Sequence, residues 1–392
     1  MGLTVTGCES AGGIRLGDGG ASRRGAGQSK CRPQTRGIPA MSFRLTIEPS
    51  GEVLEVAAEQ SLLDACLRAG VYLPYACLHG LCGTCKVQVL EGEVEHQPSS
   101  AFALMDVERD EGKCLACVTT LLSDCVIEAD VECDTDAQQL VIRDLVGRVV
   151  RVTDLSPTVK GIWLELPAPG LAFQAGQYIN LSVPGVPGPR AFSIASAPSS
   201  PTLLEVNVRR VEGGAATQYL HEQLRCGDEL ALSGPLGRFF VRTSATLPML
   251  FLAGGSGVSS PKSMLLDLLE RAWSGPLTLV YGARTPAELY DHARFVALAA
   301  QHPNFRYLAV VNEADEHWQG PTGFVHEVAD ALYLRRYAGH KAYVCGPPAM
   351  VEACVRSLMQ GRLFEQDIYT EKFLSAADAT QAVARSPLFR RL

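Results

Sequence analysis

The sequence predicts a multidomain chain that joins a small α+β domain, an antiparallel β-barrel and an α/β domain with a parallel sheet. Three observations support this division. Four spaced cysteines lie in an amino-terminal region of strand-like patterns, short β-rich runs separated by Gly and Pro fill the middle, and strands alternate with helices toward the carboxyl end. The 392 residues suffice for two or three domains.

Residues 1–40 are expected to be a disordered extension, because they are rich in Gly, Ser and Arg and lack apolar periodicity. The acidic residues Glu9 and Asp18 and the absence of an amphipathic pattern argue against a transit peptide. Met41 opens the first patterned segment, so we expect it to be the true start of the protein.

Residues 41–135 are expected to form the α+β domain, of the β-grasp type. Apolar residues alternate with polar ones as in half-buried strands, and a Ser-Gly turn separates the first two runs. The predicted elements are strands at 43–47 and 53–56, a short helix capped by Ser61, and strands at 86–90, 116–119 and 126–127.

The four spaced cysteines of this domain are Cys77, Cys82, Cys85 and Cys117. They read C-x4-C-x2-C, followed by 31 residues and the last cysteine, which is typical of a plant-type [2Fe–2S] cluster. Two glycines inside the loop suit its tight turns. Zinc is the alternative, because Cys114 and Cys117 form a second CxxC pair. The 28 residues between the pairs exceed the usual spacing, and zinc leaves Cys77 without a role.

After a linker at 136–144, residues 145–245 are expected to form the small antiparallel barrel. Arg190 can grip a pyrophosphate through paired hydrogen bonds, while the ring of Phe192 and the hydroxyl of Ser193 suit a stacked heterocycle. A glycine-rich turn before a helix is an anion site, and here it comprises Gly213, Gly214 and Thr217. Singly, these motifs also fit a barrel core and an ordinary capped turn. Together they favour a flavin nucleotide.

Residues 246–375 are expected to form a doubly wound parallel sheet, followed by a tail at 376–392. A turn between the first strand and a helix predicts phosphate binding by Gly254, Gly255 and Gly257. Cys345 and Gly346 end a later strand, at the edge where such sheets bind ligands, although a buried cysteine before a Pro turn fits the same pattern. The predicted elements are strands at 249–252, 277–281, 307–311 and 342–344 and helices at 263–273 and 287–301.

Composition narrows the function classes. The chain is 47% apolar and 20% charged, as ordinary globular proteins are. Without a signal peptide or a long apolar run, we expect a cytoplasmic protein with mostly reduced cysteines and no membrane segment. Residues 41–135 carry a net charge of −12, which fits either docking to a partner protein or simple solubility. The folded part lacks a basic face, which argues against nucleic acid.

The motifs at 190–193, 213–217, 253–257 and 345–348 together resemble those of the ferredoxin–NAD(P)+ reductase-like flavoproteins. With the cysteine domain in front, the chain resembles the three-domain reductases of bacterial oxygenases, and most closely the phenol hydroxylase reductase components. Phe192 departs from the wider pattern, in which Tyr is commoner. The segments that carry the closer resemblance are 102–106, 234–240, 361–364, 371–373, 376–378 and 386–392.

The resemblance implies an electron chain from NADH to FAD, then to a [2Fe–2S] cluster, and on to the di-iron hydroxylase component of a phenol monooxygenase. It implies that Arg190 holds FAD phosphates, that Phe192 stacks on the flavin and that Ser193 bonds near flavin N5. The glycines and Thr217 would meet the phosphates. It further places Cys345 by the nicotinamide, and Phe373 over the flavin with Glu371 ordering that site.

Two other readings stay open. The electron chain can serve a different client, such as a ring-hydroxylating dioxygenase, or the fold can be a non-enzymatic redox sensor or zinc-stabilised binding module. The coenzyme is also open, because no acidic residue or phosphate clamp follows the strand ending at Tyr281, apart from Arg284. The resemblance favours NADH.

Overall fold

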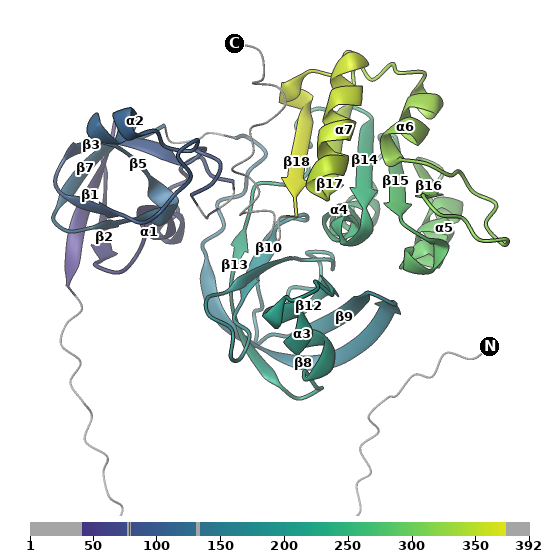
Figure 1. The fold of residues 1–392 in the computed structure, drawn as a ribbon, viewed down its shortest axis with the longest axis horizontal. Helices are drawn as coiled ribbons and strands as arrows, with labels where there is room; N and C mark the ends of the chain where they lie inside the picture. Colours follow the sequence, from purple (N-terminus) through teal and green to yellow (C-terminus); the bar gives the residue numbers. More distant parts are fainter. Residues whose placement is uncertain (1–40, 77, 79, 131–133, 374–392) are drawn as a thin grey trace, which may run out of the picture. The chain divides into compact units, whose positions relative to one another are not determined.

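The computed structural model describes residues 41–76, 78, 80–130 and 134–373 (Figure 1). The extension predicted at 1–40, the tail predicted at 376–392 and Cys77 therefore lie outside the described residues. Within the described part of the chain, no helix is long and apolar enough to cross a membrane.

The first sheet has the strand order β2-β1-β7-β3-β5, with β1 and β7 parallel and the other neighbours antiparallel. Helix α1 begins after Ser61, whose Oγ accepts the N–H of Asp64, as predicted from the capping pattern. It ends at Gly70, which has the left-handed conformation. Its apolar face packs against the sheet in one core. The elements are β1 (Ser42–Glu48), β2 (Glu52–Ala57), α1 (Leu62–Ala69), β3 (Lys86–Glu91), β4 (Val94–His96), α2 (Asp106–Asp110), β5 (Lys113–Leu115), β6 (Thr119–Leu121) and β7 (Cys125–Glu128).

One predicted strand of this domain is partly wrong. Ala116–Val118 forms a turn of 3-10 helix, and strand β6 begins only at Thr119. The hydroxyl of Thr119 donates to the carbonyl of Leu115 at 2.9 Å, which closes the turn. The apolar residues at 116–118 predicted a strand, but the hydrogen bond from the Thr119 side chain to the backbone competes with strand pairing here.

The second sheet is antiparallel, with the order β11-β10-β13-β8-β9-β12. A bridge between Ile194 and Val206 joins its two ends and closes the barrel. Strand β8 already includes Arg143 and Asp144, which the sequence analysis assigned to the linker. The elements are β8 (Arg143–Ser156), β9 (Val159–Glu165), β10 (Tyr178–Leu181), β11 (Arg190–Ser193), β12 (Leu203–Arg209), α3 (Ala215–Glu222) and β13 (Glu229–Leu236).

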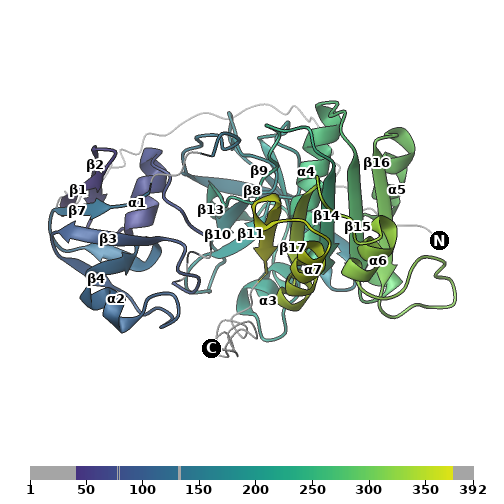
Figure 2. The same cartoon turned by 90° about the horizontal axis from the view of Figure 1, so that it is seen from above.

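The third sheet is parallel throughout, with the order β16-β15-β14-β17-β18. Figure 2 shows α4 and α5 on one side of this sheet and α6 and α7 on the other, each pair covering its own apolar core. The elements are β14 (Met249–Gly254), η2 (Gly255–Val258), α4 (Ser259–Glu270), β15 (Leu277–Ala283), η3 (Pro286–Glu288), α5 (His292–Gln301), β16 (Phe305–Val311), α6 (Val325–Tyr333), β17 (Lys341–Gly346), α7 (Pro348–Gln360), η4 (Glu365–Asp367) and β18 (Ile368–Lys372).

Two predicted helix boundaries in this domain were displaced. Helix α4 starts at Ser259, four residues before the predicted start, because its polar first turns are buried rather than exposed. The helix predicted at 287–301 begins only at His292, since Asp291 has a left-handed φ of 57°. Strand β18 was not predicted at all.

Candidate functional site

The cysteine loop owes its shape to three residues with positive φ. Leu78, Gly80 and Gly83 have φ values of 60°, 70° and 76°. Ser100 donates its N–H to the carbonyl of Gly80 at 3.0 Å, and a Cβ on Gly83 would lie 3.0 Å from the carbonyl oxygen of Ala103. Glycine is therefore needed where the following segment closes over the loop.

Two predicted cluster ligands meet in this loop. A hydrogen bond from the Cys117 side chain lowers the pKa of the Cys85 thiol, against the opposing effect of burial. A thiol of lowered pKa suits a thiolate ligand. Cys82 is exposed on the same loop. The described residues alone hold no group of three metal-binding side chains, and Cys77 lies outside them.

Cys114, the extra cysteine of the zinc alternative, belongs to the core. It lies on β5 opposite Val87 of β3 and is 2% exposed. Burial raises the pKa of its thiol to about 11. A buried, protonated thiol is a poor metal ligand, so this placement favours the four-cysteine cluster over a zinc pair made with Cys117.

At the carboxyl edge of the parallel sheet, three side chains converge on one carboxylate. Glu371 of β18 lies beside Cys345 of β17 in the parallel register. Its Oε2 accepts hydrogen bonds from Ser260 Oγ at 2.8 Å, from Ser193 Oγ at 3.4 Å and from Cys345 Sγ at 3.6 Å. Ser193 comes from the barrel and Ser260 from α4, so the group joins the barrel to the parallel sheet.

This convergence sets the protonation of the group. Burial raises the pKa of Glu371 to about 7, although the hydrogen bonds from Ser260, Cys345 and Ser193 favour the ionised form. Burial, with the Glu371 carboxylate, also raises the pKa of Cys345 well above its usual value. Cys345 therefore remains a thiol, whereas Glu371 can exchange a proton near neutral pH.

Arg190, Phe192 and Phe373 differ in their exposure and in their contacts. Arg190 is exposed, and its Nη1 donates to the carbonyls of the three preceding residues, whereas its Nε and Nη2 make no hydrogen bond to any described residue. Phe192 is half-buried against the barrel core. Phe373 donates its N–H to the carbonyl of Gly346 at 3.0 Å, which fixes the backbone after β18.

The predicted anion turn of the barrel is an ordered helix start. Gly214 caps α3, and Gly213 before it has a φ of 69°. The Oγ1 of Thr217 accepts the N–H of Val211 at 3.1 Å and donates to the carbonyl of Gly214 at 3.0 Å. The Thr217 hydroxyl thus holds the loop, which leaves phosphate contact to the N–H groups at the helix start.

The glycine turn after β14 is required by close packing. A Cβ on Gly254 would collide with Met350 Sδ, and a Cβ on Gly257 would overlap the carbonyl oxygen of Cys345. Gly255 has a φ of 54°, in the left-handed region. The three predicted glycines therefore let the turn approach the end of β17, at the edge where parallel sheets bind nucleotides.

Sequence reasoning missed two charged groups near the carboxyl edge of the parallel sheet, which we call the nucleotide edge. The Nη1 of Arg209, at the end of β12, would lie 3.4 Å from a Cβ on Gly255. Glu313 follows β16 and forms an exposed ion pair with Arg284, with 3.0 Å between the carboxylate and Nε. Two features of the sequence could have indicated these groups. Arg209 belongs to a pair of arginines shortly before Gly213, and Glu313 follows the strand predicted at 307–311.

A buried ion triad was also missed. Lys262 of α4 is 1% exposed, and its Nζ lies 2.7 Å from Glu205 Oε1 of the barrel and 2.6 Å from Asp291 Oδ2. The next helix residue, Ser263, donates its hydroxyl to the carbonyl of Ser196 in the barrel at 2.6 Å. The start of α4 is thus held to the barrel by polar contacts.

Three family models match consecutive parts of the chain. They describe a 2Fe-2S iron-sulfur cluster binding domain at residues 45–122, an oxidoreductase FAD-binding domain at 147–241 and an oxidoreductase NAD-binding domain at 251–356. The chain is 54% identical to the phenol 2-monooxygenase reductase component of Pseudomonas sp. (strain CF600), over 90% of this chain and 100% of that protein.

The chain belongs to the phenol hydroxylase reductase family. It is an oxidoreductase with sites for a [2Fe–2S] cluster, FAD and NAD, as the three domain matches show. The reductase is also 52% identical to the phenol hydroxylase P5 protein of Acinetobacter pittii (strain PHEA-2), over 90% of this chain and 100% of that protein. A crystal structure of an Amycolatopsis reductase matches with a TM-score of 0.79 and 35% identity, covering 84% of this chain and 98% of that one.

Proposed function

We propose that this reductase delivers electrons from NADH to the hydroxylase component of a phenol monooxygenase. The observation that carries the proposal is the match over the whole length of the Pseudomonas phenol 2-monooxygenase reductase component. When bound, FAD accepts an electron pair from NADH and releases it singly to the cluster. The family resemblance supports a di-iron hydroxylase as the client.

Cys77, Cys82, Cys85 and Cys117 would hold the cluster. The left-handed loop and the contact between Cys85 and Cys117 support this ligand set. No disulfide joins the cysteines within the described residues. Thiols kept reduced favour a cytoplasmic location.

The flavin would lie against the barrel strand β11. Arg190 has guanidinium nitrogens left for its phosphates, and the start of α3 offers backbone N–H groups at Gly213 and Gly214. Phe192 supplies a ring face for the flavin, and Phe373 stands at the end of β18 where it would cover the other face. Ser193 carries the hydroxyl that would meet N5.

Ser193 and Glu371 would handle the proton that leaves N5 when the flavin is reoxidised. The Ser193 hydroxyl donates to Glu371 Oε2, so a proton can pass from one oxygen to the other. With its pKa raised to about 7, Glu371 can both accept and release that proton near neutral pH. Cys345 remains protonated beside it and would pack against the nicotinamide.

NADH is the coenzyme that the edge of the sheet favours. Its phosphates would lie on the turn of Gly254, Gly255 and Gly257, opposite Gly346 and within reach of Arg209. The Glu313 carboxylate faces the same edge and would repel the extra phosphate of NADPH.

The test is reconstitution with purified oxygenase components. The reductase, NADH and phenol are combined with a di-iron phenol hydroxylase or with a ring-hydroxylating dioxygenase, and product is followed by chromatography. We expect NADH-dependent phenol hydroxylation only with the di-iron enzyme. Product with the dioxygenase alone would refute the proposed client.

A further inference from the structure

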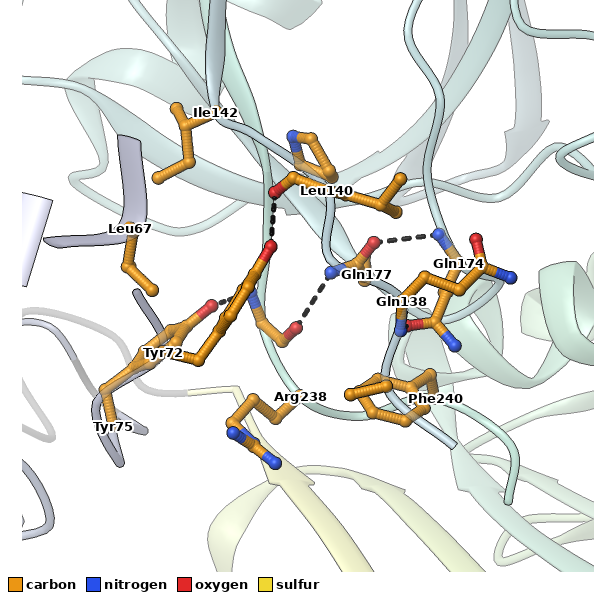
Figure 3. A pocket seen from close by; sticks show the side chains of 13 residues that line it. Leu67, Tyr72, Tyr75, Gln138, Leu140, Ile142, Gln174, Gln177, Arg238 and Phe240 are labelled. Carbon is orange, nitrogen blue, oxygen red and sulfur yellow. Dashed lines mark hydrogen bonds between the residues drawn. The ribbon is translucent and has the colours of Figure 1, made fainter. Parts of the chain in front are cut away.

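Tyr75 joins the cysteine domain to the barrel. Its hydroxyl oxygen accepts the N–H of Gly237 at 2.9 Å, and the residue is only 7% exposed. Figure 3 shows Tyr75 beside a small cavity that is lined from both domains, with Leu67 and Tyr72 from the cysteine domain and Gln177 and Phe240 from the barrel. Leu236 of the barrel is buried in the same core as Tyr75, so the surroundings of this hydrogen bond are apolar. A second, exposed contact joins the two domains, in which Arg68 of α1 pairs with Asp144 of β8 at 2.8 Å.

Gly237 is held from its other side by the barrel. It has a φ of 95°, and a Cβ there would lie 2.8 Å from the ring of Tyr178. The buried side chain of Gln177 donates from Nε2 to the Gly237 carbonyl at 3.0 Å. Gly237 is therefore hydrogen-bonded to the cysteine domain through its N–H and to the barrel side chain of Gln177 through its carbonyl.

The same connection continues to the flavin strand. Ile194 donates its N–H to the carbonyl of Gln177 at 3.0 Å, and it directly follows Ser193 at the end of β11. Tyr178, the neighbour of Gln177, is also paired with Ser193 across β10 and β11. Three hydrogen bonds thus connect Tyr75 to the strand that carries the proposed flavin contacts. At its other end, Tyr75 precedes Cys77 by two residues.

We propose that Tyr75 is a positioning residue for electron transfer from the flavin to the cluster, acting through its hydrogen bond to Gly237. One electron leaves the reduced flavin and one enters the oxidised cluster, so no further reactant is needed. Electronic coupling falls steeply with distance, and a continuous bonded path weakens that fall. The inference rests on the cluster and flavin sites of the proposed function.

Tyr72 provides a matched comparison in the same wall of the cavity. Its hydroxyl donates to the carbonyl of Leu140 at 2.8 Å, in the segment between the domains (Figure 3). It has the same chemistry as Tyr75 and a similar setting, but its hydrogen bond does not reach Gly237, which follows the barrel strand β13.

The experiment compares Tyr75→Phe, Tyr72→Phe and the parent as holoproteins. Stopped-flow absorbance separates flavin reduction by NADH from the following cluster reduction, and mass-spectrometric hydrogen exchange reports protection around Gly237. Losing one neutral hydrogen bond changes the ratio of docked to undocked domains, so we expect cluster reduction to slow by roughly twofold to tenfold in Tyr75→Phe. Exchange around Gly237 should quicken, while flavin reduction and the cluster spectrum stay unchanged. Gln177→Leu, which breaks the next bond, should slow the same step.

The outcomes separate the inference from the proposed function. Parent-like cluster reduction in Tyr75→Phe, equal slowing in Tyr72→Phe, or unchanged exchange around Gly237 would each overturn the role of Tyr75. A lost cluster in Tyr75→Phe would also overturn it, because the residue would then act on the cysteine loop itself. A parent without a cluster spectrum or without flavin reduction would instead refute the proposed sites.

Discussion

Replacing Lys262 by Met tests whether the buried triad holds the start of α4 to the barrel. Methionine keeps the length of the side chain but removes the ammonium that lies between Glu205 and Asp291. The two carboxylates then remain in a poorly hydrated site without their shared partner. Their repulsion and lost solvation should destabilise the folded state.

The structure sets the size of the effect. Removing one partner of a buried ion pair costs about 3–5 kcal/mol. The Asp291 side chain retains 15% exposure, so water relieves part of the penalty. We therefore expect a loss of about 3 kcal/mol in the free energy of unfolding. The exposed pair of Arg210 and Glu222, which also involves the barrel, should contribute no more than about 1 kcal/mol.

Urea unfolding followed by circular dichroism measures these changes, at a fixed FAD concentration because bound ligand adds stability. The variants are Lys262→Met, Glu205→Gln, their double variant and the control Arg210→Met. The double variant should regain about 1–2 kcal/mol relative to the sum of the single losses, because one repelling carboxylate is gone. A Lys262→Met loss as small as the control's, or strict additivity, would refute the argument.

Three further predictions concern the nucleotide edge. The pKa of Glu371 is raised to about 7, and the residue accepts a proton only when it is ionised. Flavin reoxidation should therefore become faster between about pH 6 and about pH 8 in the parent and should not depend on pH in Glu371→Gln. A parent rate that does not change with pH in stopped flow would contradict this. Glu313→Gln should raise kcat/KM for NADPH about tenfold by removing a repelling carboxylate, as ferricyanide reduction would show, and an unchanged ratio of NADPH to NADH activity would argue against it. Gly257→Ala should slow flavin reduction by NADH, since its Cβ overlaps the carbonyl of Cys345, and leave the cluster spectrum as in the parent; parent-like flavin reduction would disprove that packing.

The sequence predicted most of the site that lies in local motifs. The turns at Gly83 and Gly257 were predicted from the adjacent residues alone, because a tight turn depends on residues that are neighbours in the chain. Ser193 was found in the same way, at the end of a short strand. The class of all three domains also followed from alternation, since periodicity reports which face of an element is buried.

Contacts between distant elements could not be read in this way. Lys262 lay outside the helix predicted at 263–273, and its burial depends on carboxylates 57 and 29 residues away. Strand β18 was missed because Ile368–Lys372 is a short edge strand with charged residues, which alternation does not mark. The role of Glu371 was expected only from the family resemblance, although the structure shows its three hydrogen-bond donors directly.

The position of β18 has a practical consequence for protein engineering. Glu371 stands two residues before Phe373, so any affinity tag or fusion partner joined shortly after that phenylalanine is tethered beside the carboxylate that Ser193 and Ser260 contact. Attachment ahead of Met41 avoids that crowding. A chimera that couples this enzyme to an oxygenase should therefore carry the fusion partner on the amino-terminal side of Met41.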